Sequence, residues 1–221
     1  MKVCTDATLF GAMAPVKGGE RVLDIGAGTG LLALIAAQLG AAEVTAVELD
    51  EAACREAAEN FKDSPWGDRL RAVPQAVQDY ARTTVDRFDL IISNPPFFEN
   101  HSKAFSFHRN RARHTDELSF GDLIEAVDGL LADGGILYLL LPLHAVAGFT
   151  DQSREVGLCL MRQRDIRGYA HNPPKVAALT FARTAGPPEM DLLTIYRAKG
   201  IYSPESEAYL SEFLLRFGGR S

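Results

Sequence analysis

The sequence predicts an α/β domain built on a mostly parallel sheet of seven strands, with helices on both faces and an antiparallel hairpin at the C-terminal side. Strand-like and helix-like apolar patterns alternate through the first half of the chain, which is the rhythm of βαβ units. A length of 221 residues suffices for one sizeable core but not for two ordinary ones. We therefore expect residues 1–221 to form a single domain.

Each predicted element rests on a local pattern. Apolar runs predict strands at Arg21 to Ile25, Val44 to Glu48, Leu70 to Val73, Phe88 to Ser93, Ile136 to Leu141, before Ile166 and at Val176 to Arg183. Helical spacing predicts helices at Leu31 to Leu39, Glu51 to Asn60, Asp122 to Leu131, after Ala145 and at Pro204 to Phe217. Ser119 and Asp122 form a capping box, and the turn at Asn172 to Pro174 predicts that the last two strands form a hairpin.

The composition is that of an ordinary globular protein. Hydrophobic residues make up 47% and charged residues 24%, and no long apolar run or leader is present, so we expect an intracellular, cytoplasmic protein without a membrane span. A net charge of −6 gives no overall attraction for nucleic acid, so any phosphate binding must come from a local patch. The cysteines and histidines lack ligand spacing, and no metal site is predicted. The sequence does not indicate an oligomeric state.

A glycine-rich turn follows the first predicted strand. Gly26, Gly28 and Gly30 alternate between an apolar strand and a helix. Glycines at such a junction let the chain turn tightly and let a ligand lie against bare backbone beside a helix N-terminus. The alternative is a tight βα turn in a ligand-free domain. We interpret the turn as one wall of a cofactor site.

Two carboxylates indicate which cofactor this is. Glu48 ends the second predicted strand, where it can accept hydrogen bonds from both hydroxyls of a ribose. Asp24 precedes the glycines in the order D-x-G-x-G-x-G, whereas a dinucleotide site is usually G-x-G-x-x-G. Asp24 would repel a pyrophosphate but suits the positively charged methionine end of S-adenosylmethionine. The sequence therefore predicts S-adenosylmethionine as the cofactor.

The fourth predicted strand runs into Asn94, Pro95, Pro96 and Phe97 at the carboxyl edge of the sheet. A residue before proline is held extended, so the acceptors of Asn94 and Pro95 have fixed directions. The Asn94 side-chain oxygen and the Pro95 carbonyl can hold the two hydrogens of a conjugated amine, while Phe97 offers a face for a planar base. The alternative is a strand stop with a buried aromatic residue. We interpret the motif as catalytic.

A short cationic segment with interleaved aromatic residues follows this motif. Arg109, Arg111 and Arg113 could hold phosphates at the mouth of the site. The alternative is a solvated loop whose arginines pair with local acids. Proximity in sequence to Asn94 favours substrate binding.

Nearly the whole chain resembles the bacterial tRNA (adenine-N6)-methyltransferase family, which modifies valine tRNA beside the anticodon. The resemblance is carried by Met1 to Ala12, Asp24 to Leu31, Ser64 to Trp66, Ile92 to Phe97, Arg109 to Arg113 and Ile201 to Leu210. It implies a Rossmann-like class I methyltransferase fold and a tRNA substrate. It also implies that Thr5 and Asp6 border the cofactor pocket. Many members contact the cofactor adenosine with an acidic residue near the position of Ala76, but this chain departs from that pattern and has Pro74-Gln75-Ala76-Val77 there. Relatives also carry a leading segment that could belong to RNA binding.

Other enzymes share the Asn-Pro-Pro-aromatic motif. Protein-glutamine N5-methyltransferases hold an amide nitrogen with Asn-Pro-Pro-Tyr, and guanine-N2 ribosomal RNA enzymes use a similar Asn-Pro-Pro-Phe. The motif therefore defines the amine better than the molecule that carries it. A non-catalytic cofactor-binding module is a further alternative, against which the intact run from Asn94 to Phe97 argues.

Overall fold

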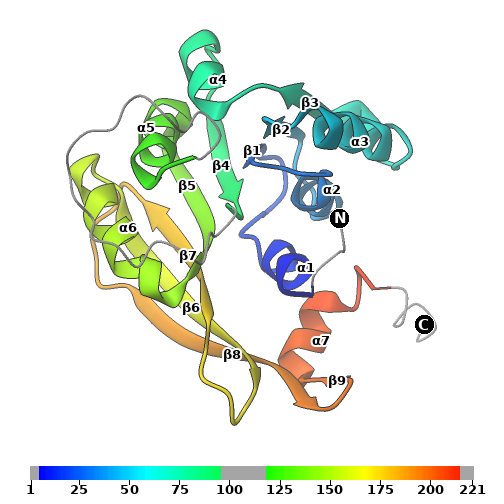
Figure 1. Cartoon of the computed structure of the whole chain (residues 1–221), viewed down its shortest axis with the longest axis vertical. Coiled ribbons are helices and arrows are strands. Elements are labelled where there is room, and N and C mark those ends of the chain that lie inside the picture. Colours follow the sequence, from blue (N-terminus) through cyan, green and yellow to red (C-terminus); the bar gives the residue numbers. More distant parts are fainter. Residues whose placement is uncertain (1–4, 96–117, 215–221) are drawn as a thin grey trace.

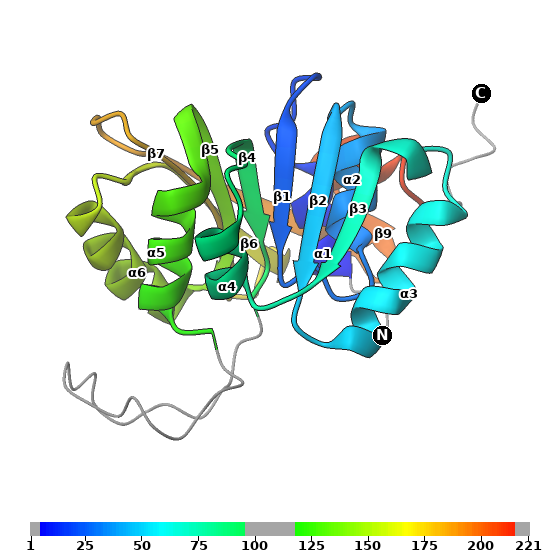
Figure 2. The same cartoon turned by 90° about the horizontal axis from the view of Figure 1, so that it is seen from above.

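Parallel pairing dominates the sheet, as the alternation of strands and helices predicts. The computed structural model describes residues 5–95 and 118–214. Nine strands of these residues lie side by side in the order β3-β2-β1-β4-β5-β7-β6-β8-β9 (Figures 1 and 2). The strands are β1 Arg21–Ile25, β2 Glu43–Glu48, β3 Leu70–Pro74, β4 Phe88–Ser93, β5 Leu131–Pro142, β6 Cys159–Tyr169, β7 Val176–Ala182, β8 Glu189–Ala198 and β9 Ile201–Tyr202.

Helices cover both faces of this sheet and bury an apolar core on each side. The helices are α1 Thr5–Ala12, α2 Leu31–Gln38, α3 Glu51–Lys62, α4 Val77–Thr83, α5 Phe120–Leu130, α6 Leu143–Glu155 and α7 Pro204–Leu210, with a short 3-10 turn at Gly67–Arg69. One core contains residues of α1, α2, α3 and α7, and the other contains residues of α4, α5 and α6. Figure 1 shows these two groups of helices on opposite sides of the strands. The arrangement is the predicted Rossmann-like α/β fold.

The C-terminal part of the sheet is larger than predicted. The hairpin is confirmed, because β7 pairs antiparallel with both β5 and β6. The prediction of seven strands is wrong, since β8 adds in parallel to β6 and β9 adds antiparallel to β8. Apolar residues of β8 lie on both of its faces, since Met190 and Leu192 are exposed while Leu193 and Ile195 are buried. The last helix was also predicted too long: it ends at Leu210.

Side-chain caps are present at the N-termini of two helices, and the first of them was predicted. The Ser119 hydroxyl accepts a hydrogen bond from the backbone N–H of Asp122 at 3.1 Å, at the start of α5. The Asp50 carboxylate accepts one from the backbone N–H of Ala53 at 2.7 Å, at the start of α3. Such caps satisfy backbone donors that have no partner within the helix. Asp50 is therefore a helix cap.

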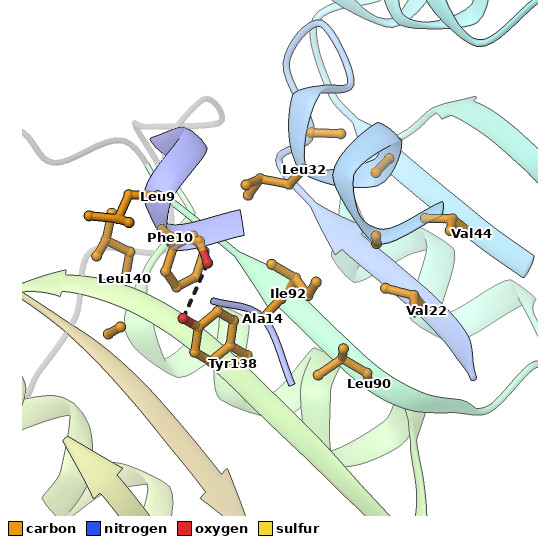
Figure 3. Close-up of a cluster of buried hydrophobic side chains, with 14 of the residues drawn as sticks. Leu9, Phe10, Ala14, Val22, Leu32, Val44, Leu90, Ile92, Tyr138 and Leu140 are labelled. Carbon is orange, nitrogen blue, oxygen red and sulfur yellow. Dashed lines mark hydrogen bonds between the residues drawn. The ribbon is translucent and has the colours of Figure 1, made fainter. Parts of the chain in front are cut away.

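An aromatic pair fastens α1 to the middle of the sheet. Phe10 and Tyr138 stack with ring centroids 4.4 Å apart and planes 5° from parallel. The buried Tyr138 hydroxyl donates to the backbone carbonyl of Phe10 at 3.2 Å, as the dashed line in Figure 3 shows. Burial raises the pKa of Tyr138, so the hydroxyl stays a donor at neutral pH. This contact fixes α1 over β5.

No helix of the described residues is long and apolar enough to cross a membrane.

Candidate functional site

The strand register brings the predicted cofactor and catalytic residues into one row. Ile25 of β1 pairs with Val47 of β2 on one side and with Ser93 of β4 on the other. The next residues of these three parallel strands are Glu48, Gly26 and Asn94. Neighbouring strands lie roughly 4.8 Å apart, so Glu48 and Asn94 flank the glycine turn at a separation of about 10 Å. The row lies at the carboxyl edge, where open α/β sheets bind ligands.

The glycine turn has the conformation that its residues predict. Gly26, Gly28 and Gly30 all have positive φ angles, of 70°, 55° and 86°. At Gly30 a Cβ atom would lie 2.4 Å from a ring carbon of Phe61, so α3 packs directly against bare backbone. Asn60 of the same helix donates from its side-chain amide to the carbonyl of Thr29 at 3.0 Å. The turn is therefore held from outside by α3.

Glu48 closes the turn from the end of β2. One carboxylate oxygen accepts the backbone N–H of Gly28 at 2.7 Å, and the other accepts that of Asp50 at 2.9 Å. A carboxylate oxygen has more than one acceptor site, so both oxygens retain capacity for ligand hydroxyls. The side chain is only half-buried. Glu48 is thus oriented by the backbone and can accept the hydrogen bonds of a ribose.

Asp24 lies inside the structure, behind the glycine turn. It is fully buried on β1, and one oxygen accepts the backbone N–H of Ala33 in the first turn of α2 at 3.1 Å. The other oxygen has no hydrogen-bond partner among residues 5–95 and 118–214. Burial above all, with the nearby charge of Glu48 acting in the same direction and the Ala33 N–H in the opposite one, raises the pKa of Asp24 to about 7. A buried carboxylate with one orphaned oxygen suits a site that receives a cationic ligand.

The raised pKa makes the stability of the protein depend on pH. The unfolded chain releases the Asp24 proton near the ordinary value of 3.8, whereas the folded chain keeps it up to about pH 7. Stability contributed by this group is therefore full below pH 4 and lost as pH rises through 7. Asp24→Asn removes the ionisable group. The unfolding free energy of this variant should therefore increase relative to that of the wild type as the pH rises from 4 to 8. The gain is at most about 4 kcal/mol, since one pKa unit corresponds to roughly 1.4 kcal/mol.

Denaturant unfolding of both proteins at several pH values checks this prediction. Asp50→Asn is the matched control, because it removes an exposed carboxylate at the same edge of the sheet. Parallel pH profiles for the wild type and Asp24→Asn would contradict the prediction.

Asn94 and Pro95 directly follow β4, beside the glycine turn. Asn94 is half-buried, and within the described part of the chain its side chain has no hydrogen-bond partner, while Pro95 is buried. The fully buried Ser93 hydroxyl donates to the carbonyl of Ile25 at 2.9 Å and ties β4 to β1 immediately before this point. The Asn94 amide is thus available to a substrate while its backbone is fixed.

The resemblance placed three further residues at the cofactor pocket. Thr5 and Asp6 begin α1, and burial raises the pKa of Asp6. The Tyr196 hydroxyl donates to the Thr5 hydroxyl oxygen at 3.5 Å. Ala76 is the N-terminal cap position of α4, and the N–H of the preceding Gln75 donates to the carbonyl of Glu48 at 3.1 Å. Ala76 therefore lies at the carboxyl edge of the sheet, two residues after Pro74, which pairs with Glu48.

Several predicted residues lie outside the described part of the chain. They are Pro96, Phe97, Arg109, Arg111 and Arg113. Among the described residues, no group of histidine, cysteine, aspartate and glutamate side chains could hold a metal ion. A cavity of about 530 Å³ between α3 and β3 is lined by residues such as Phe61, Ser64 and Leu70, and it contains none of the predicted site residues.

Three side chains that support the site were not predicted from the sequence. Ser93 and Asn60 hold β4 and the glycine turn, and Tyr138 holds α1. For Ser93, the only local signal was a serine at the end of an apolar strand, which is weak. The other two depend on partners far away in sequence, which no local pattern reveals.

Proteins similar to this chain are methyltransferases. The family model for ribosomal protein L11 methyltransferase matches residues 4–95. A tRNA1(Val) (adenine(37)-N6)-methyltransferase from Trichodesmium erythraeum is 38% identical over 98% of this chain and 92% of its own length. The enzymes of the same name from Bacteroides fragilis (strain YCH46) and Yersinia enterocolitica are 38% and 35% identical, each over 98% of this chain and over 92% and 87% of their own lengths.

Solved structures share the fold at lower identity. A predicted O-methyltransferase from Agrobacterium tumefaciens has a TM-score of 0.68 and 17% identity, covering 92% of this chain and 94% of its own. Ribosomal protein L11 methylase from Lactobacillus delbrueckii has a TM-score of 0.59 and 18% identity, covering 82% and 78%.

The fold, the glycine turn with Glu48, and the Asn94 strand end define a class I methyltransferase, a class that takes its methyl group from S-adenosylmethionine. Three relatives with one name are 35% to 38% identical to this chain over nearly its full length, which identifies the family within this class. The chain belongs to the tRNA1(Val) (adenine(37)-N6)-methyltransferase family.

Proposed function

We propose that this protein transfers a methyl group from S-adenosylmethionine to N6 of adenine 37, beside the anticodon of valine tRNA. The observation that carries the proposal is the row of Glu48, Gly26 and Asn94 across three paired strands, in a chain that belongs to this family. The row brings a carboxylate for a ribose, bare backbone and an amide acceptor within about 10 Å of one another. As a tRNA-modifying enzyme it would act in the cytoplasm.

The cofactor half of the site fits its ligand. S-adenosylmethionine supplies an electrophilic methyl group on a positively charged sulfur. Glu48 accepts hydrogen bonds from the ribose hydroxyls, and Gly26, Gly28 and Gly30 allow close approach to the backbone. The buried charge of Asp24 favours a cation at the methionine end without direct exposure to solvent. Thr5, Asp6 and Ala76 border the pocket from α1 and α4.

The catalytic half holds the amine. The lone pair of an adenine N6 amine is delocalised into the ring, which makes the nitrogen a poor nucleophile. The Asn94 side-chain oxygen and the Pro95 carbonyl accept its two hydrogens and favour a pyramidal nitrogen that faces the methyl group. Orientation and charge stabilisation suffice for the transfer, which breaks the bond from the methyl carbon to sulfur and leaves S-adenosylhomocysteine. The methylated nitrogen then carries a positive charge and releases a proton to water, so no strong base is needed. Because a residue before a proline is restricted to extended backbone, Pro96 is proposed to fix the direction of the Pro95 carbonyl.

Phe97 is proposed to stack on a flipped adenine taken from a single-stranded loop. Phe97→Tyr should stay active because the ring face is kept. Phe97→Ala should lose activity while keeping its affinity for S-adenosylmethionine, since stacking contributes on the order of 1 to 3 kcal/mol per base. Steady-state kinetics and calorimetry on both variants test this, and full activity of Phe97→Ala would contradict it. Arg109, Arg111 and Arg113 are proposed to hold phosphates around the flipped base.

The direct test is to incubate the purified protein and labelled S-adenosylmethionine with total tRNA, ribosomal RNA and a release factor in parallel. We expect label in tRNA and N6-methyladenosine in the anticodon stem-loop by mass spectrometry. Methylglutamine in the release factor, or N2-methylguanosine in ribosomal RNA, with no tRNA product would replace the proposal by those alternatives. Cofactor binding without any transfer would indicate a non-catalytic module.

A further inference from the structure

Two turns in the C-terminal part of the sheet, the β6–β7 turn and the β8–β9 turn, lie at the same sheet edge as Asn94. Because β4, β5, β6 and β8 all run in one direction, their last residues share the carboxyl edge with Asn94. The β6–β7 turn and the β8–β9 turn both project there, and Tyr169 pairs with Tyr196 across β6 and β8. Figure 1 shows both turns on the side of the molecule toward which β4 points. Three strand spacings of roughly 4.8 Å put β6 about 14 Å from β4.

These two turns carry only positive charge. The chain has a net charge of −6, yet no acidic residue lies between positions 166 and 188 or between 192 and 204. The cations of the two turns and of the strand ends beside them are Arg167, Lys175, Arg197 and Lys199, of which the last three are exposed. We call these four residues, together with Tyr169, His171 and Tyr196, the tip surface. Its charge is opposite to that of the whole protein.

The cations of the tip surface are available to a partner. Most arginines of the described residues form ion pairs with carboxylates, as Arg183 does with Asp128 and Arg164 with Asp191. In the same part of the chain, none of the four tip cations makes an ion pair, and Arg167 donates only to the Thr194 hydroxyl at 2.9 Å. Nearby Glu205 is engaged by Arg164 at 3.4 Å. Unpaired cations gathered at one edge attract an anionic ligand rather than stabilise the fold.

Aromatic rings run through the same surface as a row of neighbouring rings. Tyr202, which is buried, stacks on Tyr196 at 5.0 Å, Tyr196 lies 5.4 Å from Tyr169, and Tyr169 stacks on His171 at 5.6 Å. The row therefore leads from the core to the exposed ring of His171. Cations beside ring faces are the combination that binds a phosphate backbone and its unstacked bases. A purely phosphate-binding partner would leave the rings unexplained.

The row of aromatic rings reaches α1, the helix that is proposed to border the cofactor pocket. The Tyr196 hydroxyl donates to the Thr5 hydroxyl oxygen at 3.5 Å, at the first residue of α1. A partner on the tip surface therefore lies next to the element that covers the active site.

We propose that the tip surface is a second docking surface for the RNA substrate, which holds the phosphates and an unstacked base of the anticodon arm while the target adenine lies at Asn94. The inference rests on the proposed function. It adds a binding surface at the C-terminal extension, distinct from Arg109, Arg111 and Arg113.

The test compares two triple variants with the same change in charge. Lys175→Gln, Arg197→Gln and Lys199→Gln together neutralise the tip surface. The matched control combines Lys17→Gln, Lys62→Gln and Arg87→Gln, three exposed cations that precede β1, β3 and β4 and therefore lie toward the opposite edge. Equal thermal unfolding of both variants and the wild type establishes that all are folded.

We expect the tip variant to raise KM for a valine tRNA transcript about tenfold or more, with kcat and affinity for S-adenosylmethionine unchanged. The slope of log Kd against log salt concentration should fall by about 2, since each lost contact to single-stranded RNA removes roughly 0.7. The control variant should behave as the wild type. In a second pair, Tyr169→Leu should raise KM about tenfold and Tyr169→Phe should not, because only the ring face is needed.

The outcomes separate this inference from the proposed function. If the wild type forms N6-methyladenosine in tRNA while the tip variant keeps the KM and salt dependence of the control, the tip surface does not bind RNA and the function stands. If the wild type modifies no tRNA under these conditions, both proposals are contradicted.

Discussion

Replacing Asn94 by alanine is expected to lower kcat by about 100- to 1000-fold while affinity for S-adenosylmethionine stays the same. Removing one fixed hydrogen-bonding group that stabilises a transition state typically lowers kcat by this amount. Asn94 is suited to this role because its side chain has no hydrogen-bond partner in the described part of the chain, while Ser93 fixes its backbone through the 2.9 Å bond to Ile25. Single-turnover kinetics with tRNA and calorimetry with S-adenosylmethionine measure the two quantities separately.

Two further variants distinguish a chemical role of Asn94 from a structural one. Asn94→Asp keeps an acceptor oxygen in place and should retain more activity than alanine. Ser93→Ala keeps the amide but removes the bond between β4 and β1, so it should lower kcat by less than Asn94→Ala and also reduce stability, by about 1 kcal/mol for a lost hydrogen bond. A folded Asn94→Ala variant with near-normal turnover would remove the assignment.

The cofactor half of the site was predictable because its signals are local in sequence. Positive φ angles at Gly26, Gly28 and Gly30 require glycine, and Glu48 ends a strand whose carboxyl end must lie at the ligand edge. The spacing alone therefore predicts which residues meet. The capping of α5 by Ser119 was predictable for the same reason, since cap and helix are adjacent in sequence.

What the sequence did not reveal depends on distant partners and on burial. The strand β8 was missed because its pattern mixes exposed apolar residues such as Met190 with charged Asp191, which pairs with Arg164 on β6. Asp24 was predicted beside the cofactor, but its complete burial and its bond to Ala33 depend on how α2 packs. The cations of the tip surface stand in two turns far apart in sequence, and only the pairing of β6 with β8 brings them together.

Replacing Glu48 by alanine is expected to weaken S-adenosylmethionine binding by about 100-fold. A hydrogen bond to a charged group contributes roughly 1.5 to 3 kcal/mol, and about 2.8 kcal/mol is a factor of 100 in affinity. The substitution removes the acceptor for ribose hydroxyls and also releases the N–H of Gly28, bound now at 2.7 Å, so the glycine turn loses one of its fixed contacts. Glu48→Gln keeps the shape and one carbonyl acceptor, so its loss should be smaller.

Asp50 provides the matched control for this prediction, because it stands two residues away at the same sheet edge with a different task. Asp50→Ala removes the cap of α3 and should reduce the unfolding free energy by about 1 kcal/mol without changing cofactor affinity. Glu48→Ala should show the opposite balance, with affinity falling far more than stability. Calorimetric titration and thermal unfolding of both variants give the comparison. Unchanged affinity in a folded Glu48→Ala protein would mean that the ribose is held elsewhere along the edge, with Ala76 and its neighbours after β3 as the next residues to examine.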